Sequence, residues 1–208
     1  MKISSLIVLS ILAVAAFRAS ADSNLVVNGD FDTDVSSWLT SQNFSLVWNA
    51  EGMTQGSGSG RLTSSQMDAG GTNNGGGGAR QCVPVAGGRH DVSAFYLIPS
   101  AQNRTAEPDV ALAWFANANC QGTGVGSSLI PKGASTTDSW LQLQGRVVAP
   151  GATQSANVIL RPRKLEAGGS VDVLFDAVFL PEPGSAAAGL VAVAAIATRR
   201  RLLSRSTS

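Results

Sequence analysis

The stretch that decides the fold is Trp140-Leu141-Gln142-Leu143-Gln144, in which apolar and polar side chains alternate. A period of two is the pattern of a β-strand that buries one face. Leu141 and Leu143 are therefore expected to point inward, and Gln142 and Gln144 to point outward with Trp140. A strand of this kind predicts a sheet that packs one side against a core.

Similar short runs recur along the chain, separated by connections rich in Gly, Ser, Asn and Pro, and no long helical period interrupts them. The clearest candidate strands are residues 44–48, 92–97, 110–115, 140–148, 157–163 and 171–180. Shorter candidates are residues 25–27, 60–63 and 81–85. The pattern predicts an all-β fold, a jelly-roll β-sandwich over residues 22–180.

Composition and charge exclude some classes of protein. The chain has 208 residues and is 44% hydrophobic, which is enough for a folded core and argues against a disordered protein. Residues 22–180 carry nine basic and 13 acidic side chains, a net charge of −4. Because no basic footprint remains in this region, nucleic acid is not an expected partner.

The two cysteines, Cys82 and Cys120, both lie inside the predicted domain. An even number of cysteines in an exported chain allows one disulfide, and the chain-entropy model gives a loop of this length about 4 kcal/mol of stabilisation. The alternative is two separate buried thiols. With a single histidine, His90, a zinc site is not expected.

The N-terminus has the organisation of a signal peptide. Lys2 supplies a positive charge, residues 6–17 form an apolar run, and Ala19-Ser20-Ala21 supplies small residues for a signal peptidase. Cleavage after Ala21 is predicted, so that residues 1–21 are removed during export. The alternative is an N-terminal buried helix.

The C-terminal region, residues 181–208, begins with Pro181-Glu182-Pro183. A weakly apolar run follows at residues 185–198 and is expected to form a short helix of about 21 Å, which makes it a marginal membrane anchor. Arg199-Arg200-Arg201 then favours a cytoplasmic position for the extreme C-terminus.

These three C-terminal parts, in this order, resemble the PEP-CTERM sorting signal. The resemblance implies a Gram-negative exported protein whose tail is held in the inner membrane and is processed by an exosortase. The protein would then reach the cell surface or the extracellular space. The alternative is a C-terminal membrane anchor that is never cut.

The predicted domain resembles carbohydrate-binding modules of the CBM4/9/22 type at both of its ends. It opens with Asn24-Leu25-Val26-Val27-Asn28-Gly29-Asp30-Phe31-Asp32, with Trp38 shortly after, and it closes with a strand over residues 171–180 that contains Asp176. The segment 81–97 is similar to the family as well. The resemblance implies a galactose-binding-like jelly roll that contacts glycans.

The same resemblance implies a structural calcium ion where the first strand meets the last. Calcium prefers six to eight hard oxygen ligands, and Asp30, Asp32 or Asp34 together with Asp176 and main-chain carbonyls would supply oxygens of this kind. Asp32 stands where the family usually has Glu. The alternative is that these acids cap turns after Asn28-Gly29.

Sugar binding in such modules uses an aromatic ring flanked by polar side chains. Residues 157–163 alternate so that Asn157, Arg161 and Arg163 share one face, and with Gln142 they are expected to line a polar concave sheet. The candidate aromatic residues are Trp48, Tyr96 and Trp114, each with the alternative of a core position.

Catalysis has little support in the sequence. A nucleophilic triad would have to use His90, which lies beside Gly88-Arg89 in what is expected to be a surface turn, and no pair of carboxylates stands out for glycoside hydrolysis. The sequence therefore predicts a non-catalytic, exported binding module that contacts a polysaccharide. The alternative from another class is a structural matrix protein with no specific ligand.

Overall fold

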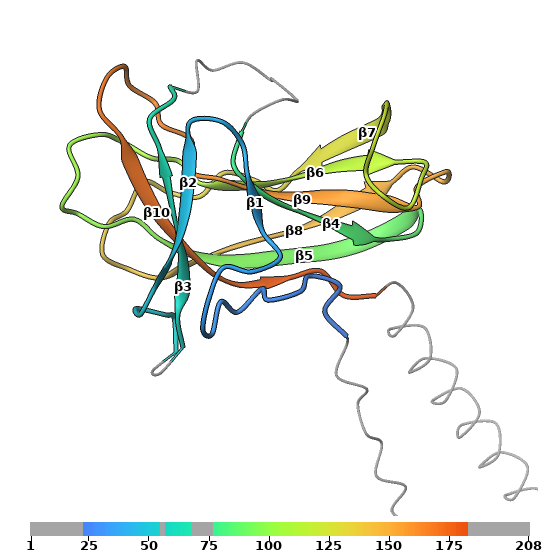
Figure 1. Cartoon of the computed structure of the whole chain (residues 1–208), viewed down its shortest axis with the longest axis horizontal. Coiled ribbons are helices and arrows are strands. Elements are labelled where there is room, and N and C mark those ends of the chain that lie inside the picture. The colour runs from blue at the N-terminus through green and yellow to red at the C-terminus, as the bar shows by residue number, and fades with distance from the viewer. Residues whose placement is uncertain (1–22, 55–56, 68–76, 183–208) are drawn as a thin grey trace, which may run out of the picture.

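The computed structural model describes residues 23–54, 57–67 and 77–182, and these residues form two antiparallel five-stranded sheets that face each other (Figure 1). We call them sheet one, with the strand order β1-β4-β9-β6-β7, and sheet two, with the order β2-β3-β10-β5-β8. Consecutive strands often lie in opposite sheets. The predicted jelly-roll β-sandwich is confirmed.

The strands are short and their bounds are as follows. Sheet one contains β1 (Leu39–Thr40), β4 (Ala79–Pro84), β9 (Ser155–Arg161), β6 (Asp109–Phe115) and β7 (Gly124–Leu129). Sheet two contains β2 (Phe44–Asn49), β3 (Ser59–Ser64), β10 (Val171–Phe179), β5 (Gly88–Leu97) and β8 (Leu141–Ala149).

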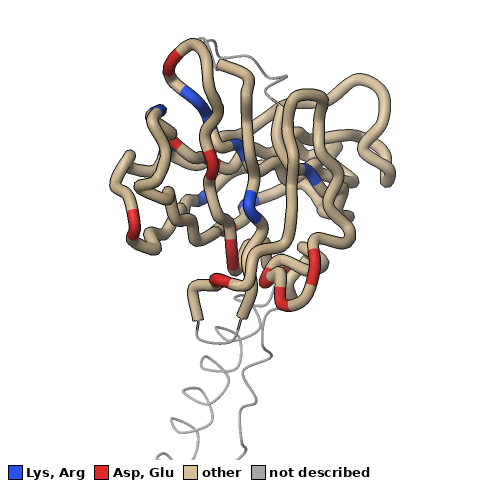
Figure 2. Tube along the Cα trace, turned by 60° about the vertical axis from the view of Figure 1, so that its left-hand side comes forward, with Lys and Arg blue, Asp and Glu red and all other residues tan. Residues whose placement is uncertain are grey.

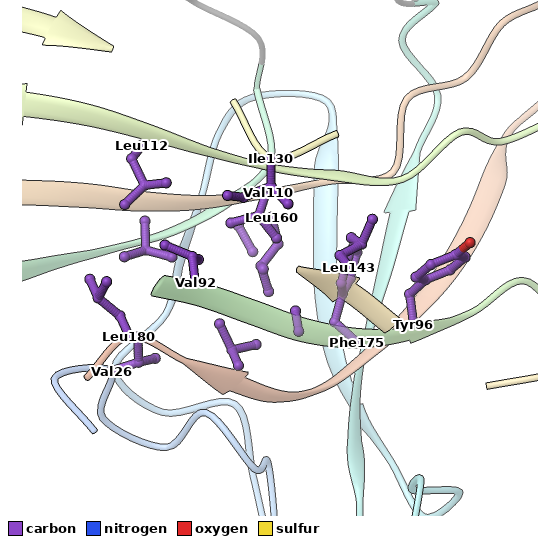
Figure 3. Packing of buried hydrophobic residues seen from close by; sticks show 14 of the residues in the cluster. Val26, Val92, Tyr96, Val110, Leu112, Ile130, Leu143, Leu160, Phe175 and Leu180 are labelled. Carbon is purple, nitrogen blue, oxygen red and sulfur yellow. The ribbon is translucent and has the colours of Figure 1, made fainter. Parts of the chain in front are cut away.

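The core fills the space between the sheets with the inward side chains of both (Figure 3). Val110, Leu112 and Leu160 from sheet one meet Val92 and Phe175 from sheet two, and all five are at most 2% exposed. Because each fully buried side chain of this size contributes about 1.5–3 kcal/mol, this layer is the main source of stability.

The disulfide joins Cys82 on β4 to Cys120 in the connection between β6 and β7. The two cysteines are 38 residues apart in the sequence. Cys82 lies on the outer face of sheet one, where burial alternates along β4. The bond therefore ties the 116–123 connection to the sheet. The predicted pairing is confirmed.

The two ends of the described chain leave the sandwich side by side (Figure 1). Asn24 and Pro181 form an antiparallel bridge, and the Leu25 amide donates to the Leu180 carbonyl at 2.8 Å. The Asn24 side chain also donates to the Val178 carbonyl at 2.8 Å. The predicted strand at residues 25–27 does not form, and only the neighbouring Asn24 makes a β-bridge, because the chain turns at Asn28, whose φ is 50°.

The predicted cleavage site at Ala21, Pro183, the apolar run and the arginines at 199–201 lie outside the described residues. Of the predicted sorting motif, Pro181 and Glu182 are described, and the Glu182 amide donates to the Ser23 carbonyl at 3.3 Å. None of the described segments is a helix long and apolar enough to cross a membrane.

Candidate functional site

A groove lies on the outer face of sheet two, over β5, β8 and the end of β10. These three strands are neighbours in that sheet (Figure 1). Its cavity volume is about 480 Å³, within the range of about 300–1,000 Å³ that is usual for ligand sites. The groove is lined by Asp91, Val92, Ser93, Gln142, Gln144, Gly145, Arg146 and Phe179.

Strand register arranges the groove as rows of side chains across the sheet. Phe179 is paired with Ser93, and Ser93 is paired with Gln144, so that one row runs from β10 through β5 to β8. Residues that oppose each other on antiparallel strands are about 5 Å apart. An aromatic ring, a hydroxyl and an amide therefore lie in line across three strands.

Gln142 and Gln144 project outward into this groove, as their alternation with Leu141 and Leu143 predicted. Both glutamines are exposed, whereas Leu143 between them is 3% exposed and packs in the core. Each amide offers two donors and one acceptor, the groups that sugar hydroxyls need. The glutamines thus supply the polar wall of the groove on its outermost strand.

A bidentate ion pair forms the next row of the groove. Arg146 donates from Nε to Asp91 at 2.8 Å and from Nη2 at 3.3 Å, and the two residues are register partners on β8 and β5. The hydrogen bond from Arg146 lowers the pKa of Asp91. Both side chains are about two-thirds exposed, so that a ligand in the groove can reach them.

Two of the three candidate platform aromatics take the alternative of a core position and do not form a platform. Tyr96 is 1% exposed and Trp114 is 0% exposed. The Tyr96 hydroxyl donates to the Ala134 carbonyl at 3.0 Å, and the indole of Trp114 donates to the Ser128 hydroxyl at 3.1 Å. Burial raises the pKa of Tyr96. Neither ring presents a face to solvent.

The third predicted aromatic, Trp48, is 42% exposed but lies away from the groove. It is on β2, the edge strand of sheet two opposite to β8. Its indole donates to the Phe31 carbonyl at 2.8 Å, and Gly58 lies directly against the ring. Trp48 and Gln142 therefore cannot contact the same small ligand.

Arg161 and Arg163 are held in a buried ion cluster on the other sheet, which corrects the expectation that they line a face with Gln142. Arg161 donates to Asp109 at 2.5 Å and 2.7 Å, and Arg163 donates to the same carboxylate at 3.4 Å. Asp109 is fully buried, and burial raises its pKa while the two arginines act against that shift.

The acids expected to bind calcium lie near each other but do not form a compact ligand set. Asp176 is 2% exposed, and its two oxygens accept hydrogen bonds from the Met53 amide at 2.8 Å and the Ala177 amide at 2.7 Å. The pKa of Asp176 is raised, mainly by burial and to a smaller extent by the negative charges of Asp30 and Asp32.

Within residues 23–54, 57–67 and 77–182, no three carboxylates, imidazoles or thiols are placed to hold one metal ion. A calcium ion here would have to take most of its ligands from main-chain carbonyls and water. Asp34 instead caps a turn, accepting from the Ser36 amide and the Asn28 side chain at 2.9 Å each, and the Ser36 hydrogen bonds lower its pKa. Calcium at this position stays a prediction.

His90 is buried rather than on a surface turn. It is 3% exposed, its Nε2 lies 2.9 Å from the Ala86 carbonyl, and its ring centroid is 6.0 Å from that of Trp114. β5 starts at Gly88, earlier than the predicted strand at residues 92–97, so that His90 is part of the strand. Its side chain is on the buried face of β5. A histidine in this position packs in the core.

Six residues of the groove were not predicted from the sequence, and four of them bring a polar, charged or aromatic side chain to it, namely Asp91, Ser93, Arg146 and Phe179. Three of them share the outward parity of Gln142 and Gln144 on paired strands, and that parity was readable in the sequence. The position of Phe179 could not be predicted from the sequence, because the strand pairing shifts register between Asp176 and Phe179.

No protein-family profile matches the chain, and no curated protein sequence does so either. Solved structures do match in fold. The CBM22-1 xylan-binding domain from Paenibacillus barcinonensis Xyn10C aligns with 77% of this chain and 95% of its own, at 16% identity and a TM-score of 0.55. The domain has the fold of these modules.

Two further similar structures show the same architecture in other contexts. A putative sugar binding protein from Bacteroides thetaiotaomicron is matched over 100% of its length and 77% of this chain, at 11% identity and a TM-score of 0.54. The CBM22-1–GH10 modules of Clostridium thermocellum xylanase 10B, complexed with xylohexaose, reach a TM-score of 0.59 at 13% identity. This chain spans 29% of that longer protein.

Proposed function

We propose that the protein is a non-catalytic glycan-binding module and that the groove over β5 and β8 is its binding site. The observation that carries the proposal is the row of Phe179, Ser93 and Gln144, which combines an aromatic ring with hydrogen-bonding groups in a hollow of suitable volume. Sugar sites need this combination, because a pyranose presents an apolar C–H face and a rim of hydroxyls. The fold shared with xylan-binding modules supports a polysaccharide as the ligand.

The alternative is a structural matrix protein that binds no specific ligand. The burial of Tyr96 and Trp114 favours this alternative, because it removes two of the aromatic platforms that the sequence offered. The groove argues against it, since a spacer domain has no need of Gln142 and Gln144 beside an accessible ring.

The test is binding of the purified protein to an array of plant, fungal and bacterial polysaccharides, followed by calorimetry with the best oligosaccharide. Replacing both Gln142 and Gln144 by Ala is expected to weaken binding about tenfold, because two hydrogen bonds are lost. The variant Phe179→Ala is expected to weaken it as well, through the loss of ring contact.

Asn157→Ala is the matched control, because Asn157 is a half-exposed amide on the outer face of sheet one. It should bind as the unmodified protein does. Loss of binding in the control with retention in the glutamine variant would move the site to sheet one. Absence of binding in a folded protein at millimolar sugar would favour the structural alternative.

Export and sorting belong to the same proposal. The signal peptide with cleavage after Ala21, and a PEP-CTERM-like tail read by an exosortase, would deliver the domain through the inner membrane to the cell surface or the extracellular polysaccharide. The Asn24–Pro181 bridge supports this organisation, because it ends the sandwich directly at the Pro-Glu-Pro motif. The N-terminal sequence and intact mass of the mature protein would test both cuts.

Calcium near Asp176 is proposed as a structural ion only. The support is electrostatic, since a cation there would offset the mutual repulsion of Asp176, Asp30 and Asp32. Calcium, and not magnesium, should then raise the melting temperature, and Asp176→Asn should remove that response. An equal melting temperature with calcium and with a chelator would contradict the proposal.

A further inference from the structure

The charges in the groove are balanced one to one. Of its eight lining residues, Arg146 is the only cation and Asp91 is the only anion, and the two are paired with each other. The remaining lining residues are uncharged. The groove as folded therefore offers a ligand neutral hydrogen-bonding groups and an apolar ring, and no net charge.

The ion pair occupies the part of Arg146 that would otherwise recognise an acidic sugar. A guanidinium binds a carboxylate best through two parallel N–H groups, and Asp91 already accepts from Nε and Nη2. The hydrogen bond from Arg146 lowers the pKa of Asp91, which favours the charged carboxylate that the pair requires. A second carboxylate at this place would compete with Asp91 and be repelled by it.

The pair is also accessible and is not needed for packing. The side chains of Arg146 and Asp91 are 65% and 66% exposed, respectively. An exposed ion pair of this kind is weak, because it favours the paired over the unpaired arrangement of the two side chains by at most about fivefold. Substitution of Asp91 can therefore release Arg146 toward the groove without disturbing the core.

Resting on the proposed function, we infer that Asp91 sets the charge selectivity of the groove. By neutralising Arg146 it restricts the site to uncharged glycans and disfavours uronate-bearing chains. Asp91 is thus a specificity-determining residue, and the neutral partner Asn would convert the groove into one that accepts acidic polysaccharide.

The test compares binding of neutral xylo-oligosaccharides and of oligogalacturonate by the purified protein and by Asp91→Asn. The variant is expected to bind oligogalacturonate about fivefold more tightly, while its affinity for the neutral ligand changes less than about twofold. The gain should fall with added salt and should be absent from the double variant Asp91→Asn/Arg146→Gln.

Arg89→Gln is the control, because Arg89 lies two residues from Asp91 on the same face of β5 but does not line the groove. An unchanged ratio of acidic to neutral binding in Asp91→Asn would overturn the inference, as would tighter binding of oligogalacturonate than of any neutral glycan by the unmodified protein.

The two proposals fail in different ways. If the unmodified protein binds no glycan but Asp91→Asn binds oligogalacturonate through Arg146, the neutral-glycan function is contradicted and the electrostatic role of Asp91 is supported. If no variant binds either class of glycan, both are overturned.

Discussion

Arg161 and Asp109 face each other directly across β9 and β6, and the arginine holds the carboxylate with two hydrogen bonds of 2.5 Å and 2.7 Å. The Asp109 side chain is fully buried and that of Arg161 is 13% exposed. Breaking such a pair leaves an uncompensated buried charge. We therefore regard this contact as a structural feature of sheet one and not as part of a ligand site.

Removal of the Asp109 carboxylate is the first prediction. Asp109→Ala should lower the free energy of unfolding by about 3 kcal/mol, because two guanidinium groups lose their buried partner. Urea denaturation monitored by tryptophan fluorescence measures the change. Asp91→Ala, at the exposed pair, is the control and should unfold at nearly the same urea concentration as the unmodified protein; equal losses in both variants would contradict the assignment.

The second prediction concerns pH and Asp176, whose pKa burial and the nearby Asp30 and Asp32 raise in the folded state. Its stabilising contribution is present below the unfolded pKa and is lost as pH rises through the folded pKa, because the folded state then gives up a proton that it holds more tightly. The free energy of unfolding of the unmodified protein, relative to Asp176→Asn, should therefore fall between acidic and neutral pH. A difference that does not change with pH would mean that the pKa of Asp176 is the same in the folded and unfolded states, and would contradict the prediction.

The disulfide gives the third prediction. Replacing Cys82 and Cys120 together by Ser should lower the free energy of unfolding by up to about 4 kcal/mol, because the unfolded chain regains the freedom of a 38-residue loop. Calorimetry of the double variant measures this loss. A melting temperature unchanged from that of the oxidised protein would contradict this account of the bond.

The fourth prediction uses two neighbouring residues of β8 as a matched pair. Leu143→Ala should cost about 2–5 kcal/mol of stability, because a buried side chain is removed, whereas Gln144→Ala should change it by less than about 0.5 kcal/mol. Chemical denaturation of both variants tests whether Leu143 faces the core and Gln144 faces solvent. A larger loss in Gln144→Ala would mean that its amide supports the fold and would weaken the proposed site.

Alternation along a strand could predict which residues share a face, and it did so for Gln142, Gln144 and Leu143. It could not predict which strands are neighbours, since pairing depends on the long-range topology. Arg161 and Gln142 both point outward, yet they lie on opposite sheets of the sandwich. The predicted polar face failed for this reason.

Weak local propensity explains the strands that the sequence did not predict. β7 at Gly124–Leu129 has the sequence Gly-Val-Gly-Ser-Ser-Leu, and two glycines and two serines give little strand preference. It forms because its pairing with β6 places it at the edge of an existing sheet. β1, at Leu39–Thr40, is too short to carry a pattern.

The site was partly predictable for a related reason. Large aromatic residues such as Tyr96 and Trp114 are as common in the core of a small sandwich as they are in ligand sites. The neighbouring residues in the sequence do not show which of these two positions an aromatic residue takes. Phe179 lies in the groove because β10 shifts register between Asp176 and Phe179, where Ala177 has a φ of 45°. An irregularity of this kind moves every later side chain and is not visible in a pattern of period two.

The bridge between Asn24 and Pro181 lies where a pull on the C-terminal end of the described chain would enter the domain. A pull at Glu182 enters β10 next to Phe179, a residue of the groove, and β10 is held on both sides by β3 and β5. The hydrogen bonds of these pairs lie across the direction of the pull, so that they share the force in shear. A pull between a ligand in the groove and Glu182 would therefore act first on strands of sheet two, the sheet that contains both the groove and β10.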